Sequence, residues 1–292
     1  MKAILNHISP KILVSLQYLY HFHKPLNWWK PKSLNEKINW LKFNSDTSLW
    51  TLCADKYRVR EYIHQKGLDE MLVKLYGKWD KAEGIEWDKL PNSFVLKTNN
   101  GSGDILVCKD KQKLDKDYVV STYAELLNKN FCDTNAEPHY AAMKPCIIAE
   151  ELLNNTKQPI ETDTLIDYKI WCFNGKPFCI FTCYNRHKHS LEIGTYDTDW
   201  NYHPEWSIYT SHYIKATKQL PKPQSLDMML KNASILSEGI PQVRVDMYEV
   251  DGKPYFGELT FTSAGGFMNY FTDHFLLEMG KLVDLRLAPR KK

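Results

Sequence analysis

The stretch Val243-Arg-Val-Asp-Met-Tyr-Glu-Val250 is followed by Asp251-Gly252 and then by a second β-rich run, residues 255–261. Asp-Gly between two such runs is among the strongest short-range signals of a β-hairpin. One carboxylate lies on each side of the turn, Asp246 before it and Glu258 after it. Magnesium prefers hard oxygen ligands and usually takes one or two carboxylates together with phosphates. The pair is therefore a candidate metal site, although two unrelated surface carboxylates on an edge hairpin give the same pattern.

The length of this turn decides whether the two carboxylates share a face of the sheet. A two-residue turn pairs Val250 with Lys253. Because side chains alternate along a strand, that register puts Glu258 on the face opposite to Asp246. A three-residue turn with Gly252 in the left-handed conformation makes Glu258 a diagonal neighbour of Asp246 on the same face. Since one metal ion requires one face, we predict the three-residue turn.

Two further hairpins are predicted upstream. Asn174-Gly175 separates residues 167–173 from residues 177–182, which is the other strong turn signal of the chain. Residues 93–97 and 105–108 flank a glycine-rich tip and read as a third hairpin.

The glycine-rich tip contains Gly101-Ser102-Gly103 and follows Lys97. A strand lysine beside a glycine loop supplies a fixed positive charge and free backbone N–H groups, which is what a polyphosphate needs. The motif is not a Walker A loop. Taken alone, it is more typical of an exposed hairpin with a mobile tip.

Residues 146–149 form a short apolar strand that runs into two acids. Such a strand end can bind adenine through its main chain and ribose through a carboxylate. The residues concerned are Glu150, Glu151, Leu152 and Leu153. Strands also often end in solvated acids, so this segment alone does not decide between the two interpretations.

Helices are expected between and before these hairpins. Ser33 and Glu36 fit a capping box that begins one helix, and a second should run from near Ala54 to Gln65 and end at Gly67. Residues 113–130 and 225–237 also read as helical, whereas the aromatic, histidine-rich residues 184–213 receive no regular element. Helices mixed with antiparallel hairpins indicate the α+β class.

Composition excludes several classes of protein. A chain of 292 residues with 43% hydrophobic and 25% charged residues can bury a full core and is not mainly disordered. The formal charge of +3 is spread along the chain, which disfavours nucleic acid as a partner. Seven cysteines without a Cys-x-x-Cys pair indicate reduced thiols rather than a disulfide framework or a zinc ribbon.

The N-terminal region bears on location. No run approaches the roughly 18 to 20 apolar residues of a spanning helix, and the order of residues differs from that of a signal peptide, so a cytoplasmic location is expected. Residues 12–32 mix apolar, aromatic and basic side chains, as a helix in a membrane interface does, which leaves a peripheral membrane contact open. A helix packed on its own domain is the commoner use of such a segment.

The order of these segments resembles the ATP-grasp superfamily, and several segments resemble its TupA-like branch, associated with teichuronopeptide and surface-polysaccharide biosynthesis. The resemblance extends over residues 31–267 and lies in Pro31-Lys-Ser-Leu-Asn-Glu-Lys37, Ala54-Asp-Lys-Tyr-Arg-Val-Arg60, residues 90–103, residues 147–152, Asp167-Tyr-Lys-Ile-Trp-Cys-Phe-Asn-Gly175 and residues 244–266. It implies an α+β ATP-grasp fold in which two α+β subdomains clasp ATP. We accordingly expect a helical N-terminal region (1–75), a small subdomain with the glycine-rich loop (76–150) and a large subdomain with the metal site (151–292).

The resemblance also implies roles for individual residues. The phosphates of ATP should bind Lys56, Lys97, Gly101, Ser102 and Gly103, and the adenine hinge should fall on Glu150, Glu151, Leu152 and Leu153. Lys169, in Asp167-Tyr-Lys169, occupies the place of a phosphate-binding basic residue that is arginine in many relatives. The metal site of the ligases ends in Glu-x-Asn, whereas this chain has Glu258-Leu-Thr260. Thr260, with its shorter reach, therefore joins Asp246 and Glu258 as a candidate ligand.

Four further residues are candidates to neutralise a substrate carboxylate or an acyl phosphate: Arg186, His187, His189 and Arg244. Exposed loop charges are the commoner explanation for such residues. Arg244 is the best of them, because residues two apart share a strand face and it should lie beside Asp246.

The reaction that the resemblance implies is ADP-forming ligation of a carboxylate to an amine, with ATP and Mg²⁺ as cofactors. The carboxylate would belong to a uronic acid or peptide of a capsule or other surface polysaccharide, and the amine would be an amino acid or small amine. Two other interpretations remain. One is a glycosyltransferase-like enzyme, for which Asp197-Thr-Asp199 is the available motif, and the other is a non-catalytic ATP-binding module.

Overall fold

The computed structural model describes residues 9–101, 103–129, 136–154, 156, 158–162 and 164–291. In this part of the chain the strands form two sheets. The small sheet has the order β1 (Leu75–Trp79), β4 (Ile147–Glu150), β2 (Phe94–Thr98), β3 (Ile105–Cys108). The large sheet has the order β10 (Lys253–Thr260), β9 (Val243–Val250), β5 (Asp167–Phe173), β6 (Lys176–Tyr184), β7 (Leu191–Asp197), β8 (Tyr213–Lys215). All neighbours are antiparallel except β7 and β8, and the expected α+β class is confirmed.

The two Gly-containing turns of the large sheet have the conformations that tight hairpins require. Asn174 and Gly175 have φ values of 47° and 78°, and Asp251 and Gly252 have φ values of 57° and 70°. Two successive positive φ angles are typical of a two-residue type I′ turn. Both predicted hairpins are therefore confirmed.

The predicted three-residue turn is wrong. Lys253 pairs with Val250, so the turn contains two residues, but a β-bulge at Gly257 shifts the register before Glu258. The extra residue brings Glu258 directly opposite Asp246, on the same face. The shared face was thus predicted correctly for an incorrect reason.

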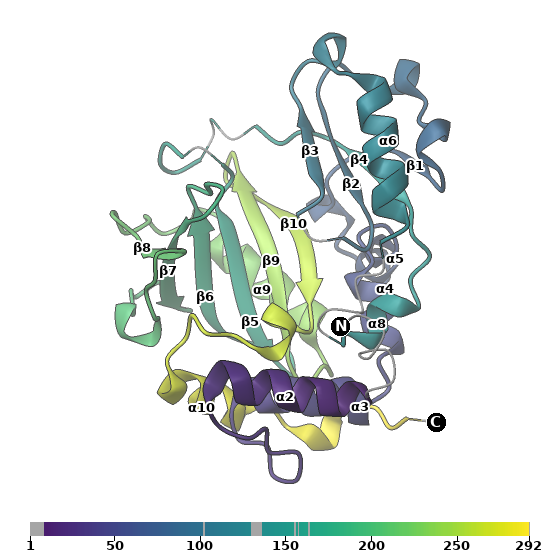
Figure 1. Ribbon diagram of the computed structural model, residues 1–292. Helices are drawn as coiled ribbons and strands as arrows, with labels where there is room; N and C mark the ends of the chain where they lie inside the picture. The colour runs from purple at the N-terminus through teal and green to yellow at the C-terminus, as the bar shows by residue number, and fades with distance from the viewer. Residues whose placement is uncertain are drawn as a thin grey trace.

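Helices cover the two sheets and fill the region beneath them. They are α2 (Pro10–Phe22), α3 (Leu34–Asn44), α4 (Ser48–Ala54), α5 (Val59–Gln65), α6 (Lys116–Leu127), α8 (Pro138–Ala141), α9 (Leu226–Ser237) and α10 (Asp273–Leu282). The predicted capping box of Ser33 and Glu36 is present at α3. Figure 1 shows α6 beside the small sheet, α9 behind the large one, and α2, α3 and α10 along the base.

Two helix and strand predictions need correction. The helix expected from Ala54 begins at Val59, because the Asp55 carboxylate accepts hydrogen bonds from the backbone N–H groups of Tyr57 and Arg58 and so forms a turn before α5. Strand β7 lies within the stretch to which no element was assigned. Residues of both faces are buried in the middle of β7, including the polar Thr195, so its sequence does not show a clean alternation of apolar and polar residues.

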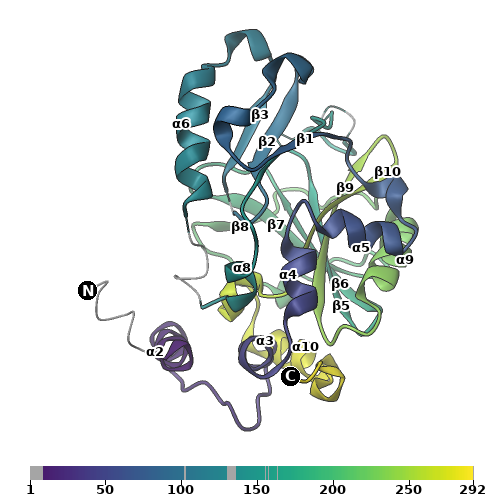
Figure 2. The ribbon, with the colours of Figure 1, turned by 90° about the vertical axis from the view of Figure 1, so that its right-hand side faces the viewer.

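The hydrophobic core divides in the same way as the sheets. A large cluster lies around β5, β6, β9 and α9, and a separate one lies between the small sheet and α6. A third, small cluster joins α2 to the rest of the molecule. Figure 2, turned to the right-hand side of Figure 1, shows α4 and α5 packed beside β9 and β10 and below the small sheet. Each sheet thus has its own core, and α4 and α5 lie where the two halves meet.

Candidate active site

Charged side chains from three neighbouring strands of the large sheet meet on one face. Lys169 on β5, Asp246 on β9 and Glu258 on β10 lie opposite one another across the ladder. Arg244 precedes Asp246 by two residues and binds it through two hydrogen bonds, Nε–Oδ1 and Nη2–Oδ2, both 2.7 Å long. Lys169 Nζ also binds Asp246. Both oxygens of this buried carboxylate are therefore paired with a cation.

Arg244 extends the cluster to β10 and to the turn that follows it. Its Nη2 donates to Glu258 Oε1 and to Thr260 Oγ1, each at 3.0 Å, and its Nη1 donates to Ser263 Oγ at 3.0 Å. Thr260 donates in turn to Glu258. The five N–H donors of a guanidinium form a rigid fork, which explains how one side chain holds so many partners.

The protonation of this cluster follows from burial and charge. Burial opposes the ionised form of Glu258, but Lys169, Arg244 and Lys56 lower its pKa to about 2. Burial raises the pKa of Asp246 against the influence of Arg244 and Lys169. Burial also acts to lower the pKa of Lys169, yet Asp167 and Asp246 raise it on balance. We therefore expect an ionised Glu258 beside cations that stay charged.

The loop after β6 reaches this cluster through one residue. Arg186 binds the buried Asp167, and Lys169 Nζ lies 3.8 Å from the same carboxylate. His187 and His189 are exposed on the loop. The structure thus places Arg186 at the edge of the cluster and leaves the two predicted histidines outside it.

The small sheet carries a simpler ion pair. Lys97 on β2 binds Glu150 on β4, with an Nζ–Oε2 distance of 2.6 Å, and Arg60 of α5 lies 3.5 Å from Glu150 Oε1. Val95 is the partner of Glu150 in the ladder, so Lys97 lies diagonally to it on the same face. Glu150, one of the four residues of the predicted adenine hinge, is thus engaged by two cations.

Lys56 lies between the two charged groups. It follows Asp55, which is buried and accepts a hydrogen bond of 2.8 Å from the Asn99 side chain. Lys56 Nζ donates to the carbonyl of Gly101, and its backbone N–H donates to Asn99. Burial lowers the pKa of Lys56, and both Glu258 and Lys97 also influence it. Lys56 is therefore close to the charged residues of both sheets.

The glycine-rich tip is held by a contact between the two residues at its base, Thr98 and Asp104. Asp104 accepts hydrogen bonds from the backbone and hydroxyl of Thr98, and a Cβ atom added to Gly101 would lie 2.3 Å from the Asp104 carboxylate. This close approach requires glycine at that position. Gly103 has a φ of 83°, whereas Ser102 lies outside the described residues.

The predicted hinge follows β4. The backbone N–H of Glu151 donates to Lys74, and the chain then leaves the sheet. The backbone groups of Leu152 and Leu153 make no hydrogen bond to any other described residue. Backbone donors and acceptors without a protein partner are what an adenine ring requires.

A magnesium ion is implied by the resemblance, and the donor atoms present fit it. Asp246 and Glu258 face each other with hard carboxylate oxygens, and Thr260 adds a hydroxyl. The Glu258 side chain is 42% exposed and uses only Oε1 in its contacts with described residues. Glu258 is thus accessible to an ion, whereas Asp246 has to share its oxygens with Arg244 and Lys169.

Two residues of the site were missed by sequence reasoning. Asp167 was quoted only as a neighbour, although a carboxylate two residues before Lys169 on a strand must share its face. Arg60 lies four residues after Lys56, a spacing that brings side chains together on a helix, but α5 begins only at Val59. Asp167 could therefore have been found from its spacing to Lys169, whereas Arg60 could not, because its position depends on where α5 begins.

Several solved structures resemble this chain at low sequence identity. No curated protein matches the chain. Solved structures that match include the D-alanine–D-alanine ligase of Bacillus anthracis, with 18% identity, 84% of this chain and 71% of that chain covered, and a TM-score of 0.46. The D-alanine–D-alanine ligase of Helicobacter pylori gives 14% identity, 89% and 68% coverage and a TM-score of 0.46. The ATP-grasp ligase PsnB in complex with a minimal precursor gives 13% identity, 82% and 62% coverage and a TM-score of 0.41.

A family model matches most of the chain. The TupA-like ATP-grasp model aligns with residues 36–284, which include both sheets, the glycine-rich tip and the charged cluster of the large sheet. The chain therefore belongs to the TupA-like ATP-grasp family and has the ATP-grasp fold.

Proposed function

We propose that the chain is an ADP-forming carboxylate–amine ligase that makes an amide through an acyl phosphate. Family membership supports ATP-dependent ligation as the general activity. The observation that carries the finer proposal is the row of Lys169, Asp246 and Glu258 across three strands, joined by Arg244. This arrangement combines two oxygen ligands with two permanent cations, which suits the transfer of a phosphoryl group.

The residues of the small sheet are proposed to bind ATP. Lys97, together with Lys56 from the segment before α5, would contact the phosphates, and the chain after β4 would bind adenine. The hydrogen-bonding freedom of Leu152 and Leu153 supports the second role. The division of the chain at residues 75 and 150 remains a prediction that accompanies these roles.

The residues of the large sheet are proposed to stabilise charge during transfer. Arg244 and Lys169 neutralise negative charge on the transferred phosphoryl group, and they are held in position by Asp246 before any substrate binds. Bound magnesium, held by Asp246 and Glu258, would supply further charge neutralisation on the phosphate oxygens. Arg186, at the edge of the cluster, is proposed to contact the carboxylate substrate.

The proposed reaction has two steps. A carboxylate oxygen of the acceptor attacks the γ-phosphorus, and the bond from that phosphorus to the β,γ-bridging oxygen breaks to release ADP. The amine then attacks the acyl carbon, loses a proton and expels inorganic phosphate. The phosphate therefore keeps one oxygen that began in the acceptor carboxylate.

The cysteines support direct attack by the substrate over a covalent enzyme intermediate. The six described cysteines are buried free thiols. Burial raises the pKa of Cys53, Cys146, Cys172 and Cys183 to about 12. A thiol is a poor nucleophile under such conditions.

The carboxylate is proposed to belong to a uronic acid or peptide of a surface polysaccharide. This proposal rests on the resemblance to the TupA-like branch. The glycosyltransferase alternative relied on Asp197-Thr-Asp199, and the structure gives this motif a different role. Asp197 accepts hydrogen bonds from the backbone of Asp199 and Asn201 and so builds the turn after β7. A carboxylate engaged in this way forms local structure, as Asx turns do.

Isotope transfer tests the mechanism. The protein is incubated with ATP, Mg²⁺ and a panel of uronic acids crossed with amines, and release of ADP identifies the active pair. The reaction is then repeated with an ¹⁸O-labelled carboxylate, and the phosphate is examined by mass spectrometry. We expect one labelled oxygen in the phosphate. AMP as the nucleotide product, or label found only in the sugar, would refute the acyl phosphate, and consumption of a sugar nucleotide would favour the glycosyltransferase.

A further inference from the structure

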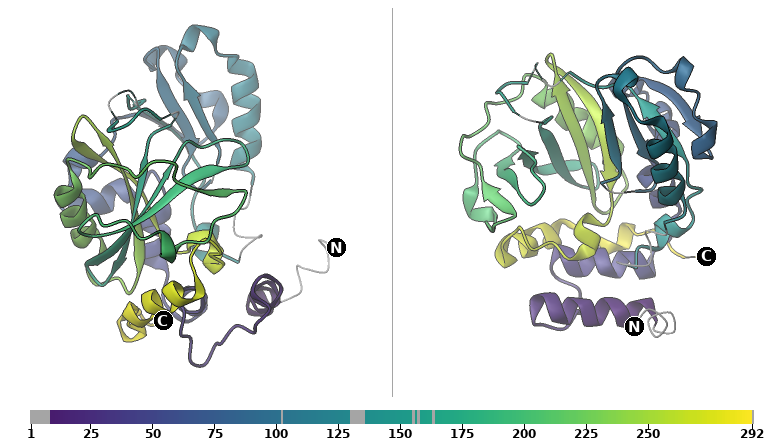
Figure 3. Two further views of the ribbon diagram at one scale, coloured as in Figure 1. Left: turned by 90° about the vertical axis from the view of Figure 1, so that its left-hand side faces the viewer. Right: turned by 45° about the horizontal axis from the view of Figure 1, so that its top comes forward.

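Positive charge is concentrated at the N-terminal end of the chain. The first 35 residues contain five lysines and no aspartate or glutamate, and the first acidic residue is Glu36. The whole chain carries a formal charge of only +3, so its remainder is slightly acidic. Figure 3 shows α2 as the outermost layer of the molecule, separated from the large sheet by α3 and α10.

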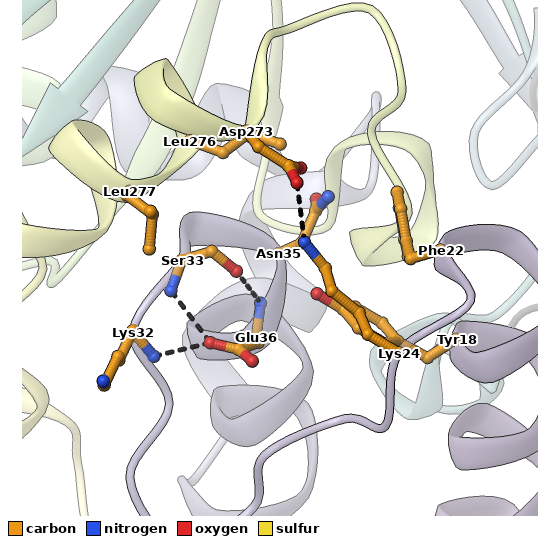
Figure 4. Close-up of a pocket in the computed structure, with 10 residues that line it drawn as sticks. All are labelled: Tyr18, Phe22, Lys24, Lys32, Ser33, Asn35, Glu36, Asp273, Leu276 and Leu277. Atoms are coloured by element: carbon orange, nitrogen blue, oxygen red, sulfur yellow. Dashed lines mark hydrogen bonds and ion pairs between the residues drawn. The ribbon is translucent and has the colours of Figure 1, made fainter.

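The inner face of α2 packs on its own protein. Val14 and Tyr18 are fully buried, and Tyr18 lies 6.2 Å from Phe267, measured between ring centroids. Tyr18 and Phe22 also line a cavity of about 140 Å³ between α2, α3 and α10 (Figure 4). Lys24 bridges the same junction with an ion pair of 2.9 Å to Asp273. This half of the helix confirms the expectation of a helix packed on its own domain.

The outer face of α2 is equally apolar and remains exposed. Ile12 and Leu16 are each 54% exposed, Leu19 is 47% exposed and Tyr20 is 78% exposed. Residues at these spacings of three to four share one side of a helix. The outer side therefore presents a continuous apolar stripe to solvent, which folded proteins usually reserve for an interface.

The loop after α2 adds an exposed tryptophan to this end of the molecule. Trp29 is 94% exposed. The Asn27 side chain accepts hydrogen bonds from the backbone of Trp29 and Lys30, and the neighbouring Trp28 donates to Ser15 on α2 at 2.9 Å. The loop is thus fastened to α2 in a conformation that holds Trp29 outward. Lys30 and Lys32 are exposed beside it.

We propose that the α2 surface, defined as Ile12, Leu16, Leu19, Tyr20 and Trp29 with the surrounding lysines, docks on an anionic lipid bilayer. Apolar side chains would enter the boundary between headgroups and acyl chains, the tryptophan would lie at headgroup level, and the lysines would contact anionic headgroups. Among the described residues no helix is long and apolar enough to cross a bilayer. The contact is accordingly confined to the interface.

Charge favours a bilayer over a second copy of the chain. Two copies meeting through this surface would bring two acid-free, lysine-rich segments together, which like-charge repulsion opposes. An anionic bilayer offers complementary charge and apolar depth at once. The inference does not rest on the proposed reaction, because α2 contributes no residue to the candidate active site.

Vesicle flotation tests the proposal. The full chain is mixed with vesicles of phosphatidylcholine, alone or with about a third phosphatidylglycerol, and floated on a density gradient. We expect binding to the anionic vesicles that weakens as salt is added. Leu16→Ser/Leu19→Ser should lower the partition coefficient by roughly tenfold or more. Lys30→Gln/Lys32→Gln, at the two exposed lysines beside Trp29, should lower it by a similar factor on the anionic vesicles alone.

The matched control replaces two exposed apolar residues on other helices. Tyr118→Ser/Met228→Ser, on α6 and α9, should leave the partition coefficient within about twofold of the wild type, because scattered surface apolar residues form no docking face. Thermal unfolding verifies that every variant folds. Failure of the wild type to float, or equal loss in the control variant, would overturn the proposal. So would a dimer of the wild type that fails to bind vesicles and that Leu16→Ser/Leu19→Ser converts to a monomer.

Discussion

The two charged groups of the candidate site, one on each sheet, are built in different ways. In the large sheet, Arg244, Lys169, Asp246 and Glu258 come from three adjacent strands, and each contacts at least one other member of the group. In the small sheet, Glu150 is the one ion-pair partner of Lys97 among the residues that the structure describes. The first group is fixed by strand register, whereas the second depends on a single ion pair between neighbouring strands. The network of the large sheet is therefore positioned before substrate binds. Lys97 has to give up its ion pair with Glu150 in order to bind a phosphate.

Removal of the central arginine should produce the largest effect, since it breaks the network of the large sheet. Arg244→Met leaves the buried Asp246 with Lys169 as its remaining cation and strips Glu258 and Thr260 of a donor. We expect loss of ligase turnover and a loss of about 3–5 kcal/mol in the free energy of unfolding. Urea denaturation and ADP release measure the two quantities.

The control for this variant is an arginine in an exposed pair. Arg286 is bound to Asp284 at 2.7 Å, but its side chain is 90% exposed. Arg286→Met should therefore change the free energy of unfolding far less than Arg244→Met does. If the two variants lost the same stability, the large-sheet network would be no more than a group of ordinary surface contacts.

Removal of one carboxylate should abolish chemistry while the fold survives. Glu258→Gln keeps the shape of the side chain and the hydrogen bond from Thr260 but removes a hard anionic ligand. We expect turnover at limiting magnesium to fall by about a hundredfold or more, and Asp246→Asn should act in the same direction. Glu238→Gln, at an exposed ion pair with Lys66, provides the control. Near-normal activity of Glu258→Gln at limiting magnesium would show that the metal pair is wrongly assigned.

The pH dependence of the unfolding free energy tests whether Glu258 is held by the surrounding cations. The pKa of Glu258 is lowered to about 2 in the folded protein, while an unfolded glutamate titrates at about 4. A depressed carboxylate pKa stabilises the folded state above the unfolded pKa, and this contribution disappears as the pH falls through the folded pKa. The difference in unfolding free energy between wild type and Glu258→Gln should therefore shrink between about pH 4 and about pH 2. A difference that stays constant over this window would show that Glu258 is not held by the three cations.

The lone lysine of the small sheet should matter for binding and little for folding. Lys97→Ala leaves Glu150 with Arg60 as a partner, so the loss of stability should be smaller than that of Arg244→Met. Loss of a charged contact to phosphate should weaken ATP binding by about tenfold to a hundredfold. Calorimetric titration with ATP measures this, and Lys78→Ala, at a strand lysine paired with Asp80, is the control. Unchanged affinity in a folded Lys97→Ala protein would remove Lys97 from the site.

Much of the fold was readable because it is encoded locally. Asn174-Gly175 and Asp251-Gly252 specify their turns through residues that tolerate positive φ, and Ser33 specifies the start of α3 through its own hydroxyl. Sequence reasoning also placed Arg244 beside Asp246, because a spacing of two on a strand fixes the face.

Features that depend on distant partners could not be read in this way. The pair of Lys97 and Glu150 exists because β2 and β4 are neighbours in the sheet, although β2 ends at Thr98 and β4 begins only at Ile147. The contact between Arg186 and Asp167 likewise forms only because the chain returns along β6 to the beginning of β5. Such contacts follow from sheet order and loop path, which no local propensity specifies.

The bulge at Gly257 is another of these non-local features. It shifts the register of β10 so that Glu258 lies opposite Asp246. The φ of Gly257 is not in the left-handed region, so alanine is permitted by the backbone. A Cβ atom there would nevertheless lie 3.0 Å from the carbonyl oxygen of Asp246 and 3.3 Å from the Tyr248 ring. Because the strand that must yield carries Asp246, we expect Gly257→Ala to cost about 1 kcal/mol of unfolding free energy and to raise the magnesium concentration needed for turnover.

The control for Gly257→Ala is a glycine with space around it. A Cβ atom on Gly84 would meet nothing closer than 3.8 Å, so Gly84→Ala should leave both stability and the magnesium requirement unchanged. The comparison separates two explanations of how Asp246 and Glu258 come to face each other. If the bulge sets their alignment, the methyl group added by Gly257→Ala must alter the magnesium requirement together with the free energy of unfolding. If Gly257→Ala loses stability but keeps the wild-type magnesium requirement, the alignment is maintained by Arg244 alone, and the bulge only accommodates it.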